Sequence, residues 1–514
     1  MKLKIKILGL ESGGKPIAII NFEDAEELGI RSGSRIKIQT KKKTITAIVN
    51  IAKRVVPKNF IGIYEEVQSV LEVRENEEVE VEPAKFPKSL QYIKNKLKGR
   101  TLSREEIFQI VRDVVEGNLS ELEIASFVTA LNDFGLSLDE TINLTLAMIE
   151  TGKKLELETK NSIVDKHSVG GLPGDKTTLL LVPIIAAAGL TIPKTSSRAI
   201  TSAAGTADRA SVLMNVELEI EEMRNVVNKC NGCIVWGGAL HLAPADDIFI
   251  QIEHPLSIDP LLLPSIMSKK KAVGSNFLVI DIPTGRGSKV KTIGDANLLA
   301  KDFIELGKRL GIKTECAVTY GEEPLGYAIG PALEAREALE ILMRRKNVPD
   351  VIDKAVDLAG ILLKMTNKGD RRTALEILKS GEAEKKLREI ISWQGGDSHI
   401  RPEDIEIGSY GLDMRTDRNG FVLWLDNNAL VEVARAAGAP KDKGSGILLR
   451  KKVGDFVKKG DIIFTVFSEK SRKLERVRKI LEEEHCFGVG ERREILIHVV
   501  REEPLHKKTF ILDR

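Results

Sequence analysis

Cysteine is scarce in this 514-residue sequence, which has only four. Four cysteines are too few for a disulfide framework in a chain of this length. The one close pair, Cys230 and Cys233, has no second pair and no nearby histidine at the spacing of a metal site. We expect ordinary buried or edge thiols there, with a disulfide or a redox role as the open alternative. The sequence therefore predicts no bound metal.

An excess of charge is also missing, and so are long hydrophobic runs. The 78 Lys and Arg residues against 75 Asp and Glu give a net charge of +3, which offers no general attraction for nucleic acid or an anionic membrane. The longest apolar stretch, 179–190, is about 12 residues, too short to cross a bilayer. The N-terminus lacks the apolar run of a signal peptide. We expect a cytoplasmic protein without nucleic-acid or membrane partners.

What the sequence does have is length, charge of both signs and several changes of hydrophobic period. A chain of 514 residues exceeds the size of one hydrophobic core, so several domains are expected. Charged residues make up 30% of it and are rich in Lys and Glu, which is typical of a heat-adapted protein.

The hydrophobic period is that of strands at the start of the sequence and that of helices in the segment that follows. Residues 2–7, 35–40 and 44–49 favour strands, which predicts a small barrel-like domain. From Thr101 the period is helical, and three capping boxes follow, Ser103 with Glu106, Ser120 with Glu123, and Ser137 with Glu140. With Gly117, Gly135 and Gly152 as stop signals, they predict three short helices over 101–152.

Beyond residue 160 short apolar strands alternate with helical stretches, and beyond about 410 turn-rich β segments return. The expected fold class is α/β and multidomain. We predict a β-barrel-like domain (1–84), a helical domain (88–165 and 243–275), a phosphate-binding domain with a mixed or parallel sheet covered by helices (166–242 and 276–405), and a C-terminal α+β, β-rich domain (406–514).

Two polar segments have the composition of an anion site. Residues 165–178 place three glycines, two lysines and three hydroxyls directly before an apolar helical run. Amides near a helix N-terminus favour an anion, and glycines allow the backbone to approach it. The alternative is a polar loop whose glycines serve only turns.

The second segment, 194–208, contains six hydroxyl side chains and one arginine and follows an apolar stretch. We expect it at the carboxyl end of a strand, where α/β sheets bind their ligands. The alternative is a helix cap rich in Ser and Thr. Two such segments about 30 residues apart favour a phosphate site.

These segments resemble the signatures of the thymidine and pyrimidine-nucleoside phosphorylase family. The matches are Lys166-His-Ser-Val-Gly-Gly171 and Ser196-Ser-Arg198 through Gly205-Thr-Ala-Asp208, and the resemblance covers roughly residues 88–505. It implies that phosphate is bound by Lys166, Ser168, Thr178, Ser196 and Thr206. His167 would lie near the glycosidic bond as a catalytic residue. The nucleotide would be contacted by Gly171, Ser197, Arg198, Ala199, Ile200 and Thr201.

A third segment, 259–270, resembles the family helix that contacts the base, which implies Ser265 and Lys269 as base-binding residues. Other features depart from the family pattern. Residues 251–258 lack the arginine that reads a pyrimidine carbonyl, the first loop has an extra residue around Pro173, and Ala210-Ser211 replaces a hydrophobic residue followed by Glu. The base pocket is therefore expected to differ from that of the pyrimidine enzymes.

The most informative departure is the glycine-rich loop 284–291, which contains three cations. Arg286 and Lys289 are suited to a second phosphate, the 5′-phosphate of a nucleotide. The alternative is a solvated basic loop. Together with the β domain at residues 1–84, this loop resembles the archaeal AMP phosphorylase branch of the family.

The resemblance implies phosphorolysis of AMP to adenine and ribose 1,5-bisphosphate, with CMP and UMP as further candidate substrates. Phosphate is a co-substrate, and no cofactor is expected. The departing base needs a proton, and we predict Asp259 as the donor, with a helix N-cap as its alternative role. A nucleoside phosphorylase is the main alternative, followed by a phosphoribosyltransferase and a phosphate-binding protein. A homodimer or larger homo-oligomer is expected.

Overall fold

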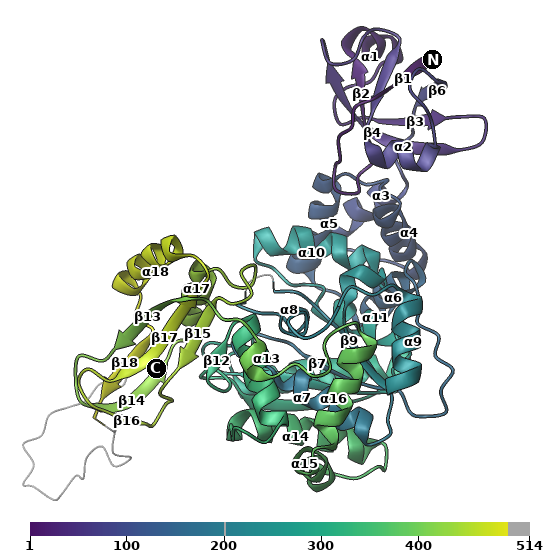
Figure 1. Ribbon diagram of the computed structural model, residues 1–514. Helices are drawn as coiled ribbons and strands as arrows, with labels where there is room; N and C mark the ends of the chain where they lie inside the picture. The colour runs from purple at the N-terminus through teal and green to yellow at the C-terminus, as the bar shows by residue number, and fades with distance from the viewer. Residues whose placement is uncertain (200–201, 492–514) are drawn as a thin grey trace, which may run out of the picture.

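The computed structural model describes residues 1–199 and 202–491. Two predicted nucleotide contacts, Ile200 and Thr201, and the end of the predicted C-terminal domain lie outside these residues. Figure 1 shows a barrel at one extremity, a helical bundle beneath it, a central α/β part, and a β-rich part on the opposite side. The expected fold class is confirmed.

The N-terminal part is a closed barrel with strand order β1-β5-β2-β4-β3-β6. Alternate side chains such as Leu3 and Ile5 are fully buried inside it, as the period of two requires. Arg35 attaches the barrel to the helical bundle, because its Nε donates to the Asn118 carbonyl at 2.7 Å and its guanidinium pairs with Glu123. The strands are β1 (Lys2–Ile7), β2 (Ile17–Asn21), β3 (Arg35–Gln39), β4 (Thr44–Ala52), β5 (Phe60–Ile63) and β6 (Glu78–Pro83), with helices α1 (Phe22–Leu28) and α2 (Glu65–Leu71).

The helical bundle combines two stretches of the chain in one apolar core, where Phe127 of the first stretch packs against Phe249 of the second. All three predicted capping boxes are present, so the three helices expected over 101–152 are confirmed. The helices are α3 (Ser89–Lys96), α4 (Arg104–Val115), α5 (Glu121–Phe134), α6 (Leu138–Glu150), α10 (Pro244–Leu256) and α11 (Leu262–Ala272).

The central part has a parallel sheet, one of the two forms expected. Three strands lie in the order β11-β10-β7, β8 pairs with β9, and an isolated bridge from Ile163 to Thr191 links the two groups. Because the strands are parallel, their carboxyl ends share one edge, which is where such sheets bind ligands. The strands are β7 (Val164–Ser168), β8 (Ile192–Ser196), β9 (Gly232–Trp236), β10 (Phe277–Thr284) and β11 (Lys313–Tyr320).

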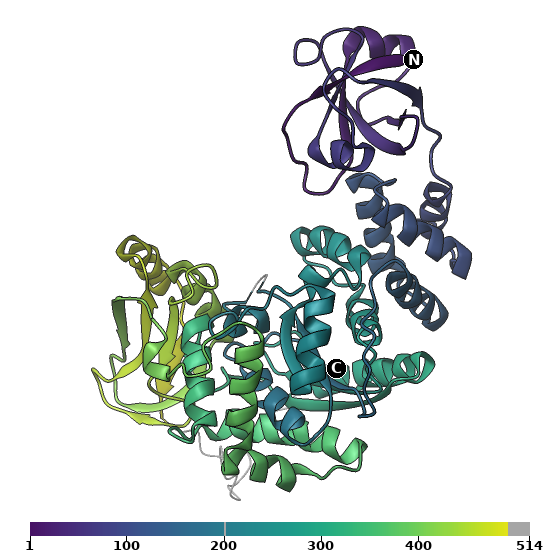
Figure 2. The same ribbon diagram turned by 45° about the vertical axis from the view of Figure 1, so that its right-hand side comes forward.

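Helices cover this sheet, and Figures 1 and 2 show them around it from two directions. Helix α7 (Thr177–Ala187) is apolar all round, and its Leu and Ile side chains are fully buried. The others are α8 (Thr206–Ala210), α9 (Ile220–Cys230), α12 (Ile293–Leu310), α13 (Pro331–Leu342), α14 (Pro349–Met365), α15 (Arg371–Ser380) and α16 (Glu382–Trp393).

The C-terminal part has two antiparallel sheets, β12-β15-β17-β13 and β16-β14-β18. Strand β12 (Ala328–Ile329) comes from the central part of the chain and pairs with β15, so the two parts are joined through the sheet itself. The remaining elements are β13 (Tyr410–Arg415), β14 (Gly420–Leu425), α17 (Asn427–Ala437), β15 (Gly446–Leu449), β16 (Phe456–Val457), β17 (Ile462–Ser468), α18 (Ser471–Glu483) and β18 (Phe487–Gly490).

The structure answers two questions that the sequence raised. Cys230 and Cys233 are both buried free thiols, which selects the simpler of the two expectations for that pair. Among the described helices, none is both long enough and apolar enough to cross a membrane.

Candidate active site

The first predicted segment connects strand β7 to helix α7 at the ligand-binding edge of the sheet. Lys166, His167 and Ser168 end the strand, and Thr178 lies in the first turn of the helix. A Cβ on Gly171 would lie 2.5 Å from the backbone nitrogen of Lys289, so only glycine allows this contact. The predicted phosphate segment and the predicted basic loop therefore touch.

Lys166 is buried with its ammonium 3.8 Å from Asp281 Oδ2. The same oxygen is 2.9 Å from Lys354 Nζ, and Thr319 donates to Asp281 Oδ1 at 2.6 Å. Burial opposes the charge on Lys354, but Asp175 and Asp281 outweigh it and raise its pKa. At 3.8 Å the Lys166 ammonium is too far from Asp281 Oδ2 for a hydrogen bond, so its N–H donors can be offered to an anion.

On the other side of β7 two lysines lie close to the buried Asp165. Lys270 of helix α11 places Nζ 2.8 Å from Asp165 Oδ2, and Lys194 lies 3.9 Å from Oδ1. Burial and the charge of Lys270 hold the pKa of Lys194 well below its ordinary value. Burial and the charges of Lys270 and Lys194 also hold the pKa of His167 well below its ordinary value. His167 is therefore neutral at pH 7 and can accept or donate one hydrogen bond.

The second predicted segment begins at the carboxyl end of β8, as expected. Ser196 ends the strand, but its hydroxyl donates to the Val235 carbonyl at 2.9 Å, so the proton is already used. Thr206 is the first residue of helix α8. Ser197 is exposed, and its carbonyl accepts from the Ala207 amide at 3.2 Å. The Ser196 and Thr206 hydroxyls thus lie at the ligand-binding edge of the sheet, although only that of Thr206 lies at the start of a helix.

Asp208 organises the rest of this segment. Its Oδ2 accepts from the Ala199 amide at 2.6 Å and the Gly205 amide at 2.9 Å. Arg198 contacts Asp208 Oδ1 at 3.2 Å and Glu217 Oε1 at 2.6 Å, and lies over Trp236. The arginine predicted to contact the nucleotide is therefore already paired with two carboxylates.

The predicted base-binding residues share one partner. Ser265 donates to Asp246 Oδ2 at 2.9 Å, and Lys269 forms an ion pair with the same oxygen. Burial opposes the charge on Lys269, but Asp246 and Asp247 outweigh it and raise its pKa. Burial raises the pKa of Asp247 to about 6. These aspartates begin helix α10, where acidic residues are common for electrostatic reasons, so the sequence alone did not identify them.

Asp259 lies in the loop between α10 and α11, and its alternative role as a helix N-cap is wrong. Helix α11 begins at Leu262, and Leu261 occupies the cap position. A turn precedes the helix, because the Leu262 amide donates to the Asp259 carbonyl. The Asp259 side chain instead pairs with Lys289, with Oδ2 and Nζ 3.1 Å apart. The predicted proton donor and a predicted phosphate ligand are thus in direct contact.

The other cations of the basic loop point elsewhere. Arg286 is 86% exposed and pairs with Glu322 at 3.2 Å, while Lys291 donates to the Arg286 carbonyl at 2.7 Å. Ser288 holds the loop by donating to the Gly321 carbonyl at 3.0 Å. The structure therefore brings Lys289, rather than Arg286, to the predicted proton donor.

Several buried charges around the site were missed from sequence, among them Asp165, Asp281 and Lys354. One signal was available, because Lys354 lies three residues after Val351 and four before Leu358, on the buried stripe of α14. A lysine on an apolar stripe indicates a buried partner. The two aspartates follow apolar strand residues but have no spacing that names their partners.

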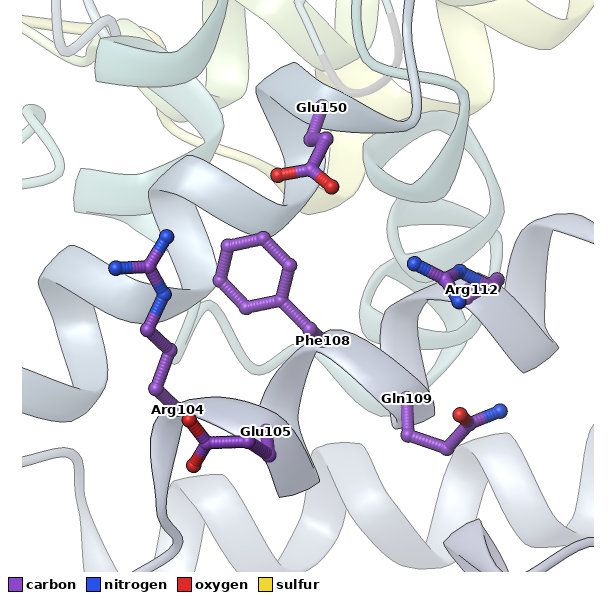
Figure 3. Close-up of a pocket in the computed structure, with 6 residues that line it drawn as sticks. All are labelled: Arg104, Glu105, Phe108, Gln109, Arg112 and Glu150. Carbon is purple, nitrogen blue, oxygen red and sulfur yellow. The ribbon is translucent and has the colours of Figure 1, made fainter.

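Figure 3 shows a hollow of about 300 Å³ on the helical bundle, where Phe108 lies between Arg104 and Glu150. Its other lining residues are Glu105, Gln109 and Arg112. None of the residues predicted to bind phosphate, ribose or base lines it, so it is separate from the candidate active site.

Comparisons with known proteins agree with this arrangement. Residues 90–152 match the helical bundle domain of a glycosyl transferase family, and 160–384 match the a/b domain of a glycosyl transferase family. Residues 421–485 match the pyrimidine nucleoside phosphorylase C-terminal domain. Anthranilate phosphoribosyltransferase from Thermus thermophilus has a similar fold, with a TM-score of 0.51 at 19% identity over 59% of this chain and 98% of its own.

Full-length relatives are much more similar. AMP phosphorylase from Thermofilum pendens is 48% identical over 517 residues, covering 100% of both chains. AMP phosphorylase from Pyrococcus furiosus is 50% identical over 482 residues, covering 93% of this chain and 95% of its own. The matched segments include the barrel, the phosphate segments and the basic loop together, and the chain belongs to the AMP phosphorylase family.

Proposed function

We propose that this protein cleaves AMP with inorganic phosphate to give adenine and ribose 1,5-bisphosphate. The observation that carries the proposal is the contact between Gly171 and the backbone of Lys289, which joins a phosphate segment to a second cationic loop. A nucleoside without a 5′-phosphate would need only the phosphate segment. CMP and UMP are further candidate substrates, but residues 251–258 have no arginine to select a pyrimidine, which favours AMP.

The attacking phosphate is bound, in this proposal, by Lys166, Ser168, Thr178, Ser196 and Thr206. Lys166 supplies the charge, and the helix start at Thr177 supplies amides and a favourable dipole. The Ser168 Oγ accepts from the Gly170 amide at 3.4 Å, so its proton is free for the anion. Ser196 must first turn away from Val235, which makes its contribution the weakest of the five.

The nucleotide lies between this site and helix α11. We assign the sugar and its surroundings to Gly171, Ser197, Arg198 and Ala199, the base to Ser265 and Lys269, and the 5′-phosphate to Lys289 with Arg286. Ile200 and Thr201 lie outside the described residues and keep their assignment from the family resemblance. Neutral His167 is suited to a hydrogen bond near the glycosidic bond, because its low pKa excludes it as an acid at pH 7.

Bond changes follow from this placement. A phosphate oxygen forms a bond to C1′ while the bond from C1′ to the base nitrogen breaks, and the electron pair of that bond passes to the base. Asp259 donates the proton that neutralises the base. Positioned acids of this kind contribute about 10²- to 10⁴-fold to rate. The ammonium of Lys166, at the end of β7, stabilises the attacking anion.

The competing function is phosphorolysis of unphosphorylated nucleosides. The phosphate segments suit both functions, but Lys289 beside the proton donor favours a substrate with a 5′-phosphate. The cytoplasmic location and the homo-oligomeric state expected from the sequence belong to this proposal as well.

The deciding experiment incubates the protein with phosphate and either AMP, adenosine or thymidine, and follows release of the free base. We expect kcat/KM for AMP to exceed that for adenosine by at least tenfold, as expected for one charge-assisted contact. The matched variant Asp259→Asn should still bind AMP and lose turnover by about 10²-fold or more. Equal rates with AMP and adenosine would contradict the proposal.

A further inference from the structure

The ion pair between Lys289 and Asp259 joins two residues with different proposed tasks. Lys289 Nζ lies 3.1 Å from Asp259 Oδ2, and the two side chains are 52% and 45% exposed. They come from different parts of the fold, since Asp259 precedes α11 of the helical bundle and Lys289 follows β10 of the central sheet. The ion pair therefore occupies the carboxyl that is proposed to serve the departing base.

A third residue completes this cluster. Glu253, on helix α10, is buried, and its Oε1 accepts from the Leu261 amide at 3.2 Å, which fixes the loop that carries Asp259. Burial and the charge of Asp259 raise the pKa of Glu253 to about 8. At pH 7 Glu253 is therefore mostly neutral, and Lys289 is the charged neighbour of Asp259 in this cluster.

We propose that Lys289 is a specificity-determining latch, released from Asp259 when the 5′-phosphate of the substrate takes its ammonium. The inference rests on the proposed function and deepens it. Without a 5′-phosphate, the ion pair stays closed and Asp259 Oδ2 stays engaged with Lys289. With it, Lys289 pairs with the substrate, and Asp259 is released to act as the proposed proton donor to the departing base.

The exchange of partners is energetically easy. A half-exposed ion pair is worth about 0.2–1 kcal/mol, because water screens both charges. A phosphate monoester has close to two negative charges and three acceptor oxygens, so it attracts the ammonium more strongly than one carboxylate does. The 5′-phosphate of the substrate thus releases Asp259, the residue that serves the cleavage of that same substrate.

The test uses Lys289→Met in the full-length protein, with kcat/KM measured for AMP and for adenosine at pH 7. The latch predicts opposite changes, because AMP loses a contact while adenosine meets a freed Asp259. We expect at least a tenfold fall for AMP and a rise of about two- to fivefold for adenosine, the factor that corresponds to the pair energy. Lys289→Arg should retain the preference for AMP. Lys301→Met, on an exposed position of α12, is the matched control for lost charge.

A second measurement uses phosphite as the probe. Added phosphite should raise the rate of adenosine cleavage in the wild-type protein and leave Lys289→Met unchanged. If Lys289→Met cleaves adenosine no faster than the wild type, Lys289 only binds the substrate and the latch is wrong. That result would leave the proposed function intact, since AMP cleavage by the wild-type protein is measured separately.

Discussion

Lys354 Nζ lies 2.9 Å from Asp281 Oδ2 although both side chains are almost completely buried. Such a pair is costly to break from one side, because the remaining charge has no water to solvate it. Asp281 in turn lies beside Lys166, so the pair stands directly behind the proposed phosphate ligand.

Replacing Lys354 by methionine should therefore destabilise the protein and weaken phosphate binding. We expect a loss of about 3–5 kcal/mol in the free energy of unfolding, measured by urea titration at pH 7. The KM for phosphate should rise as Asp281 attracts Lys166. Lys364→Met, at an exposed position of the same helix, should stay within about 0.5 kcal/mol of the wild type. Equal stability of the two variants would rule out an uncompensated charge.

The raised pKa of Glu253 predicts a pH-dependent stability. Its ordinary pKa of 4.5 rises to about 8 in the fold, so between these values the folded carboxyl keeps a proton that the unfolded one releases. The stability present below pH 4.5 is lost as pH rises toward 8, by up to about 1.4 kcal/mol for each pH unit. Glu253→Gln cannot ionise, so the urea midpoint of this variant should rise relative to that of the wild type as pH rises from 5 to 8. Glu150→Gln is the matched control at an exposed site, and a parallel pH profile for wild type and Glu253→Gln would contradict the prediction.

Two neighbouring threonines give a matched test of the phosphate site. Thr178→Val should raise the KM for phosphate by about 10- to 100-fold, since a hydrogen bond to a charged group contributes about 1.5–3 kcal/mol. Thr177 Oγ1 is buried and has no hydrogen-bond partner among the described residues, and Thr177→Val should change KM little. Steady-state kinetics with varied phosphate measure both. If Thr177→Val raised the KM for phosphate more than Thr178→Val, the Thr177 hydroxyl would be the one that contacts the anion.

The thiols should be unreactive in the folded protein. Burial raises the pKa of Cys230 and Cys486 to about 12 and also that of Cys233 above its ordinary value, so little thiolate is present at pH 8. We expect a thiol reagent such as DTNB to label these three slowly in buffer and all four cysteines rapidly in urea. A count of two thiols in urea without reductant would indicate a disulfide between Cys230 and Cys233.

Local features of the fold could be predicted from the sequence. Ser103, Ser120 and Ser137 begin their helices as their capping boxes require, because a cap and its partner lie only three residues apart. The strand pattern at 2–7 survives unchanged for the same reason, since alternation is a property of neighbouring residues.

Contacts between distant residues could not be predicted in this way. The sequence identified Asp259 and Lys289 separately, but their ion pair depends on how the helical bundle meets the sheet. The alternative role of Asp259 as a helix N-cap was wrong for a similar reason: a turn precedes α11, and the Leu261 amide donates to Glu253, eight residues earlier. Glu253 has no sequence signal of its own beyond being an acid on an amphipathic helix.

Helix α11 carries Lys269 toward Asp246 and Lys270 into the buried pair with Asp165. Two adjacent residues of this helix thus connect it to both domains, Lys269 to the helical bundle and Lys270 to the sheet. Sliding the bundle away from the sheet would separate the buried pair of Lys270 and Asp165, whereas a rotation about the pair leaves it intact. Any movement of the helical bundle against the sheet should accordingly be a rotation about Lys270, in which distant parts such as the barrel move farthest.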